Sequence, residues 1–213
     1  MYNGMQKMAR INCKFLEKLS LESCTLNTEC CKEISNCIDI SVLNLSMCGG
    51  LNLTGILSVL KLRSLTELNV AWCSFNKQQV DVICKMLPST MTRLNISGCE
   101  ENMSDLNLSD LILSCPNIKE LDLSDNTSLT EDIFSELTNL HNLEHLSLSR
   151  CFNIKSLSKL DLNLVPYFEY LDIFDLELTS VPDKLKINQF LFTSIARPTL
   201  KDHKTIWGLY VKS

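Results

Sequence analysis

The nine-residue stretch LTELNVAWC, at residues 65–73, decides the fold, because altered copies of it recur along most of the chain. If the positions of each copy are numbered from one to nine, every copy has Leu at position four, and successive copies begin 24 to 27 residues apart. The other copies are LEKLSLESC (16–24), ISVLNLSMC (40–48), MTRLNISGC (91–99), IKELDLSDN (118–126), LEHLSLSRC (143–151) and the weaker FEYLDIFDL (168–176). Self-similarity at this period indicates a repeat architecture.

The frame has the form LxxLxLxxN/C, which is that of a leucine-rich repeat. Each unit supplies a short strand whose leucines point inward, and no unit can bury that apolar face alone, so neighbours must stack. The sequence therefore predicts an α/β fold, a curved leucine-rich-repeat solenoid with parallel strands on the concave face and helices on the convex face.

The segments between the copies have the i, i+3, i+4, i+7 spacing of apolar residues that is typical of helices. This spacing occurs at 53–60, 80–87 and 108–115. Asn76, followed three residues later by Gln79, predicts the start of the second of these helices. We expect residues 1–14 to be the return helix of an incomplete upstream repeat, residues 15–187 to hold about seven repeats and a contracted last one, and residues 188–213 to form a tail.

The eleven cysteines follow the repeat rather than the spacing of a metal site. Five of them occupy the ninth position, where a turn requires a compact side chain, and Asn126 takes that position in the fifth copy. The chain contains no CxxC motif, so we interpret the cysteines as structural thiols and expect no metal or other cofactor. The odd cysteine count favours a reducing, intracellular compartment.

No glycine-rich phosphate loop and no serine, histidine and acid grouping with a motif-like context is present, so we expect no enzymatic activity. No apolar run approaches the length of a membrane span. The net charge of −5 is distributed unevenly: residues 184–213 hold six basic groups and one acid, a charge of +5, which leaves −10 for the rest of the chain. A nucleic-acid-binding arm is less favoured for this tail, because its aromatic and apolar residues are interleaved at no regular spacing.

The fifth and seventh positions are predicted to form a floor of small polar groups on the concave face. The eighth position, where each strand ends, differs because it includes Trp72, Asp125 and Arg150. Trp and Arg are favoured anchors in protein interfaces, so this rim is a candidate binding surface. An alternative stays open: Asp125 and Arg150 pair only with each other, and Trp72 packs only on a neighbouring repeat.

The tail after the last frame position carries too much aromatic surface to remain in water. We expect it to fold back on the acidic concave face, with its basic groups facing acids of the strands. The residues expected to dock there are Phe192, Ile195, Arg197 and Trp207.

The motifs ELNVAWC, LNISGC, SCPNIKELDLSD, LEHLSLSRC and FTSIARPT, followed by IWG, closely resemble the C-terminal half of the S-phase kinase-associated F-box protein family. Members of that family are substrate receptors of SCF ubiquitin ligases. The resemblance implies a non-catalytic receptor that binds a cyclin-kinase-subunit accessory protein and a phosphorylated cell-cycle regulator, in the nucleus and cytoplasm. It implies neither nucleic acid nor a membrane as a partner.

Carried over residue by residue, the resemblance places Trp72, Asp125, Arg150 and Phe190 at positions that contact the partner. Glu100 stands where the family has a basic contact, and Gln189 stands where it has His, so part of the interface differs in charge.

Nothing in these residues resembles the F-box that binds the Skp adaptor, so the Skp adaptor and a cullin are expected as partners only if an F-box lies upstream. The alternative function is a generic intracellular leucine-rich-repeat scaffold that binds an unrelated protein partner. A fragment, an incomplete gene model and a natural short form that acts as a decoy are also open.

Overall fold

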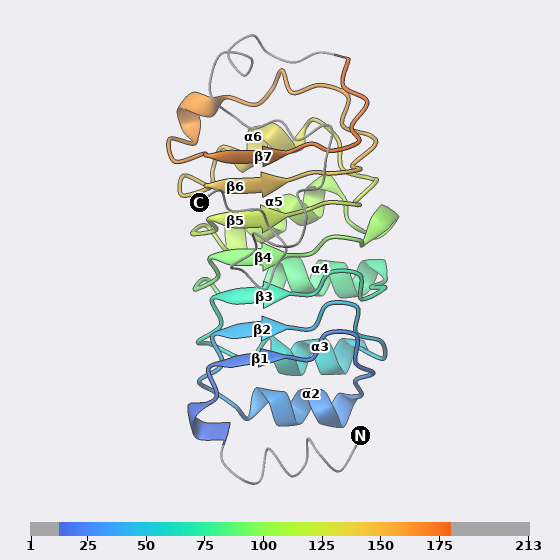
Figure 1. The fold of residues 1–213 in the computed structure, drawn as a ribbon, viewed down its shortest axis with the longest axis vertical. Helices are drawn as coiled ribbons and strands as arrows, with labels where there is room; N and C mark the ends of the chain where they lie inside the picture. Colours follow the sequence, from blue (N-terminus) through green and yellow to red (C-terminus); the bar gives the residue numbers. More distant parts are fainter. Residues whose placement is uncertain (1–12, 180–213) are drawn as a thin grey trace, which may run out of the picture.

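The computed structural model describes residues 13–179 of the chain. Within this range, seven short parallel strands form one sheet in sequential order, as Figure 1 shows. The strands are β1 (Lys18–Ser20), β2 (Val42–Asn44), β3 (Glu67–Asn69), β4 (Arg93–Asn95), β5 (Glu120–Asp122), β6 (His145–Ser147) and β7 (Tyr170–Asp172). Neighbouring strands pair at equal frame positions, so that Leu68 is opposite Leu94 and Leu94 is opposite Leu121. The predicted solenoid is confirmed.

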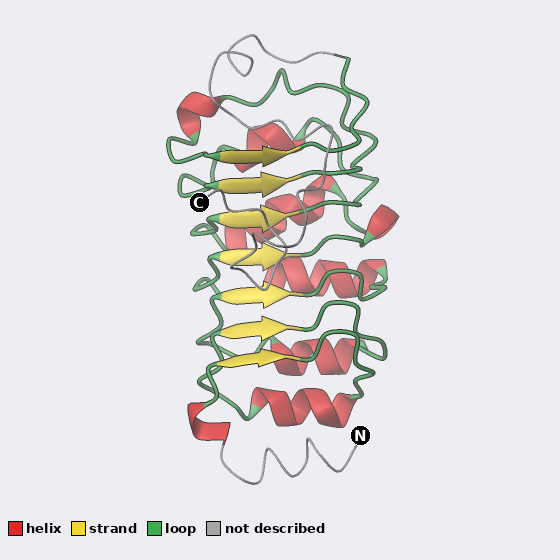
Figure 2. Cartoon of the chain, viewed as in Figure 1, coloured by secondary structure: helices red, strands yellow, loops and turns green. Residues whose placement is uncertain are grey.

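The helices lie in a second layer behind the sheet (Figure 2). They are α2 (Thr28–Ser35), α3 (Leu53–Val59), α4 (Lys77–Met86), α5 (Asp105–Ser114) and α6 (Ile133–Leu137), with the short 3-10 turns η1 (Cys13–Phe15), η2 (Glu100–Asn102) and η3 (Leu162–Leu164). The fully described stretch between β6 and β7 returns through η3 alone and has no α-helix. The helical layer therefore becomes thinner toward the last repeats.

The core lies between these two layers. The leucines of frame position four in β2 to β7, for example Leu94 and Leu121, are almost completely buried. Burying one such side chain contributes roughly 1.5–3 kcal/mol relative to leaving it exposed. Because each repeat adds the same leucines at the same depth, the core continues from one repeat to the next without a break.

The capping residues fix where the helices begin. The side chain of Asn76 accepts a hydrogen bond from the backbone of Gln79, and the side chain of Gln79 accepts one from the backbone of Asn76. This capping box confirms the predicted helix start. Asn52 caps α3 through the backbone N–H of Gly55. Such caps satisfy backbone donors that would otherwise have no partner at a helix start.

Cys48, Cys73 and Cys151, at the ninth position, donate hydrogen bonds across repeats. The thiol of Cys73 donates to the carbonyl of Leu45 at 3.0 Å, and that of Cys151 donates to the carbonyl of Leu123 at 3.2 Å. Burial raises the pKa of both thiols to about 12. The structure thus gives these cysteines a structural role, because a buried thiol with a raised pKa is a poor nucleophile.

We predict that three thiols of the native protein react with a water-soluble disulfide reagent at neutral pH, and that the other eight react only after unfolding. Cys13, Cys24 and Cys30 are partly exposed, whereas the remaining eight cysteines are buried. Titration with and without denaturant counts the two classes directly. Rapid reaction of many more than three thiols in folded protein would contradict the packing at the ninth position.

The predicted domain boundaries are described only in part. Cys13 lies in η1, and residues 1–12 of the expected return helix lie outside the described residues. The contracted last repeat around residues 185–187 and the tail at 188–213 lie outside them as well. Within residues 13–179, no helix is long and apolar enough to cross a membrane.

Candidate functional site

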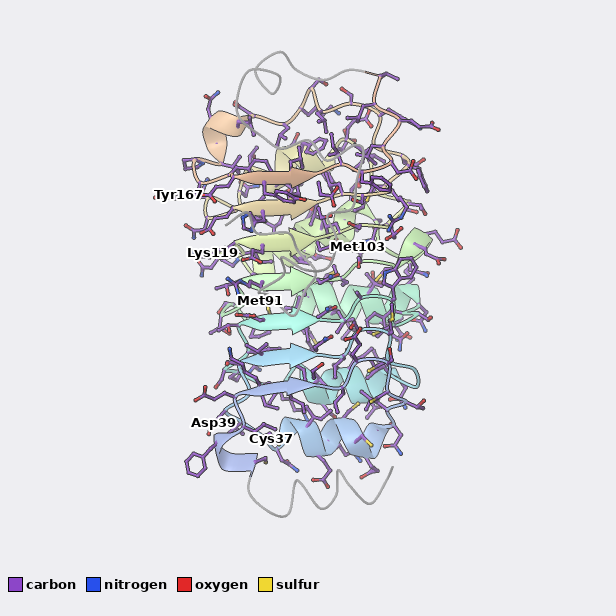
Figure 3. All side chains as sticks on the ribbon, viewed as in Figure 1. Cys37, Asp39, Met91, Met103, Lys119 and Tyr167 are labelled. Carbon is purple, nitrogen blue, oxygen red and sulfur yellow. The ribbon has the colours of Figure 1, made fainter. Side chains whose placement is uncertain are left out.

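The eighth frame position forms one edge of the strand face, which we call the rim, at the carboxyl ends of the strands. The rim consists of Ser23, Met47, Trp72, Gly98, Asp125, Arg150 and Asp175. All seven residues have positive φ values, between 57° and 73°. Figure 3 labels Met103 on the side where the strands end, and Lys119 and Tyr167 on the opposite side, where the strands begin.

Backbone hydrogen bonds between repeats produce this conformation. The N–H of Trp72 donates to the carbonyl of Ser97, and the N–H of Gly98 donates to that of Ser124, both at 2.9 Å. The ladder therefore continues beyond the strands, and the left-handed residue then turns the chain away from the sheet. This conformation costs about 1–2 kcal/mol for a residue with a Cβ atom. Since every repeat has it, the turn and not a particular function determines it.

The side chains of Asp125 and Arg150 form a two-pronged ion pair on the rim. Nε of Arg150 donates to Oδ1 of Asp125, and Nη2 donates to Oδ2, each at 2.5 Å. This hydrogen bonding raises the pKa of Arg150, although partial burial acts in the opposite direction. The structure thus contains the pair between Asp125 and Arg150 that the sequence suggested. The two hydrogen bonds hold the two charges at a fixed spacing on the rim.

Trp72 is the largest exposed side chain of the rim, with 43% of its surface accessible. It lies between two open hollows of about 400 Å³ each. One hollow is acidic, and its other lining residues are Glu100, Glu101, Asp125 and Thr127. The other is mainly uncharged, and its lining includes Met47, Gly49, Gly50 and Gln79. Trp72 therefore separates two surfaces of different chemistry.

The polar floor predicted at position five has a local structural role. Asn69 accepts the backbone N–H of Ala71 at 3.0 Å, and Asp122 accepts that of Ser124 at 2.9 Å. These bonds satisfy the backbone where each strand ends. Asn69 is buried, as are the equivalent Asn44 and Asn95, so they expose less surface than the sequence interpretation assumed.

Sequence reasoning missed an ionic ladder at position three. Arg93 in β4 contacts Glu67 in β3 at 3.2 Å and Glu120 in β5 at 2.8 Å. His145 in β6 lies 3.8 Å from Glu120. Register alone could have revealed the ladder, because these residues occupy the same position in neighbouring strands.

The carboxyl groups of Glu120 and Asp122 on the strand face differ in their pKa values. Burial by itself would raise the pKa of Glu120, but contact with His145 and the charge of Arg93 outweigh it, so its pKa is lowered. Burial raises the pKa of Asp122 to about 6, and hydrogen bonds from Ser124 only partly oppose the rise. The middle of the strand face holds the acids Glu67, Glu120 and Asp122 beside the one base Arg93, so acidic groups outnumber basic ones there, as the sequence suggested.

The structure brings Trp72, Asp125 and Arg150 onto one rim, with Glu100 and Glu101 lining the hollow beside Trp72. Phe190 and the predicted docking residues Phe192, Ile195, Arg197 and Trp207 lie outside the described residues. Gln189 lies outside them too. Among residues 13–179, no cluster of three or more His, Cys, Asp or Glu side chains could hold a metal ion.

The parallel sheet, the outer helices and the partly exposed rim define a leucine-rich-repeat protein-interaction module. Residues 4–213 match the family described as the SKP2 LRR domain. This match extends over nearly the whole chain, and the protein belongs to that family.

Several solved structures share the fold. An internalin (inlC2) from Listeria monocytogenes superposes with a TM-score of 0.59 at 16% identity and covers 88% of each chain. Another internalin (inlF) of that organism has a TM-score of 0.57 at 16% identity, covering 84% of this chain and 56% of the internalin. A leucine-rich-repeat protein from Leptospira interrogans has a TM-score of 0.54 at 19% identity, covering 87% of this chain and 49% of the other. The chain thus spans about half the length of these last two proteins.

Proposed function

We propose that this protein is the substrate-recognition module of an SCF-type ubiquitin ligase. It binds a phosphorylated cell-cycle regulator together with a cyclin-kinase-subunit accessory protein, and it performs no chemistry itself. The observation that carries the proposal is the match of residues 4–213 to the SKP2 LRR domain. The same proposal includes a nuclear and cytoplasmic location, with the Skp adaptor and a cullin as partners where an F-box is joined to these repeats.

The rim supports this proposal physically. Trp72 offers a large aromatic surface, and aromatic and arginine side chains supply much of the energy at protein interfaces. The Asp125 and Arg150 pair offers both signs of charge at a fixed spacing, which favours one orientation of a partner over others. An interface centred on Trp72 would then have an aromatic anchor flanked by charges.

The first experiment is calorimetry of the purified 213-residue chain against the accessory protein in the presence of a phosphorylated inhibitor peptide. We expect the intact chain to bind, and Trp72→Ala to weaken binding by about 1–3 kcal/mol, because the buried aromatic area is lost. A truncation after residue 187 tests the tail and is expected to abolish binding.

Met86→Ala is the matched control, because Met86 is 47% exposed, similar to Trp72, but lies on α4 in the helical layer. We expect it to leave binding unchanged. Circular dichroism establishes that each variant is folded. If the folded intact chain does not bind, the protein is an interaction module with a different partner, and the acids Glu100 and Glu101 beside Trp72 are the first place to look for altered specificity.

A further inference from the structure

Gly98 differs from the other rim residues because it has no side chain. Its φ of +73° is that of the left-handed turn found in every repeat, yet the other six repeats place a residue with a Cβ atom there. The turn alone therefore does not require glycine at this position. A contact that is specific to this repeat must explain it.

The indole of Trp72 supplies that contact. A Cβ atom added to Gly98 would lie 2.5 Å from Cδ2 of Trp72, 2.8 Å from Cε3 and 2.9 Å from Cε2. These atoms include the bond shared by the two indole rings, so the ring system as a whole lies against the backbone of Gly98. The ring thus reaches from its own repeat across to the next one along the rim.

Neither backbone can move away to make room for a side chain. Trp72 and Gly98 are each held by an N–H bond of 2.9 Å to the following repeat, at Ser97 and Ser124. The indole, in contrast, is partly exposed and can rotate into solvent. A methyl group at position 98 would therefore displace the ring and leave the solenoid intact.

We propose that Gly98 is a positioning residue for partner binding: it provides the bare backbone on which the Trp72 indole rests, and so separates the acidic hollow from the uncharged one. This role rests on the proposed function in so far as a partner uses Trp72. If the ring is displaced, it no longer divides the two hollows, and a partner that packs against the Trp72 ring loses its anchor.

The test begins in a Trp207→Phe background, which leaves Trp72 as the only tryptophan. We expect Gly98→Ala to increase acrylamide quenching of Trp72 fluorescence, because the indole loses its cover. The melting temperature should fall by only about 2–8 °C, since the added strain is that of one left-handed alanine. Gly49→Ala is the control, because a Cβ atom there meets nothing within 4 Å, and it should change neither quantity.

Binding to the accessory protein and phosphopeptide is measured with the native Trp207 restored. Gly98→Ala should weaken binding about tenfold. It should have no further effect when Trp72→Ala is already present, because no ring is left to displace.

Unchanged quenching in folded Gly98→Ala protein would overturn the positioning role. Increased quenching, with binding unaffected by both Trp72→Ala and Gly98→Ala, would support the contact between Gly98 and Trp72 and reject the use of this rim in the proposed function. A binding loss equal in the presence and absence of Trp72 would reject the coupling between the two residues.

Discussion

Asn126→Ala is expected to destabilise the protein by about 3–5 kcal/mol, the upper end of what a single substitution does. Asn126 is fully buried, and its side chain joins two repeats. Its Oδ1 accepts the backbone N–H of Cys99 at 3.0 Å, while Nδ2 donates to the carbonyls of Ile96 at 3.2 Å and Leu123 at 2.9 Å. Alanine would leave the buried N–H of Cys99 without a partner, which costs about 1–3 kcal/mol. The carbonyls of Ile96 and Leu123 would keep only the weak thiol donors of Cys99 and Cys151, and the missing side chain would leave a cavity.

Asn126→Cys is the matched variant, because cysteine occupies the ninth position in most other repeats. A thiol at 126 could donate to the carbonyl of Ile96, as the thiol of Cys151 does to that of Leu123. We expect it to recover about half of the loss. Urea unfolding followed by far-ultraviolet circular dichroism measures both variants. A loss below about 1 kcal/mol for Asn126→Ala would show that these bonds contribute little across the repeat junction.

Phe134→Ala is expected to cost about 3–5 kcal/mol, as is usual for removing a buried phenyl group. Phe134 is a fully buried residue of α6, which has five residues and no side-chain hydrogen bond at its N-cap. A helix this short is not stable by itself, so packing against the core must maintain it. The variant should therefore lose α6 and loosen the repeats on either side.

Hydrogen exchange resolves this effect by region, and Phe134→Leu is the control because it retains most of the apolar volume. We expect amides of α6 and β6 to exchange much faster in Phe134→Ala, while those of β2 and β3 change less, since repeats contact mainly their neighbours. Uniformly faster exchange along residues 13–179 would instead indicate that the solenoid unfolds as one unit.

The sequence determined most of the architecture. The seven copies fixed the number, the order and the register of the strands, because leucines at one frame position must lie at one depth in a stacked core. The spacing of apolar residues located α3, α4 and α5, and the pair Asn76 and Gln79 located the start of α4. The sequence also assigned the cysteines to structural positions, because residues at the same frame position have similar surroundings in every repeat.

The rim was only partly predictable. Its column of residues followed from the frame, and Asp125 next to Arg150 suggested a pair that the structure contains. The roles of Trp72 and Arg150 in partner binding stay predictions, and the calorimetry of Trp72→Ala tests the first of them. The functional roles given to the tail, from Phe190 to Trp207, concern residues outside the described range.

Only the tertiary structure decided how the rim side chains lie. Trp72 rests on Gly98, 26 positions later in the chain. A periodic pattern gives the position of each Cα atom but not the rotamer that a side chain adopts against its neighbours. The rotamer depends on the left-handed turn at each strand end and on the size of the side chain at the same position in the adjacent repeat. The place of the Trp72 ring between the two hollows therefore follows from the stacked repeats and not from the frame alone.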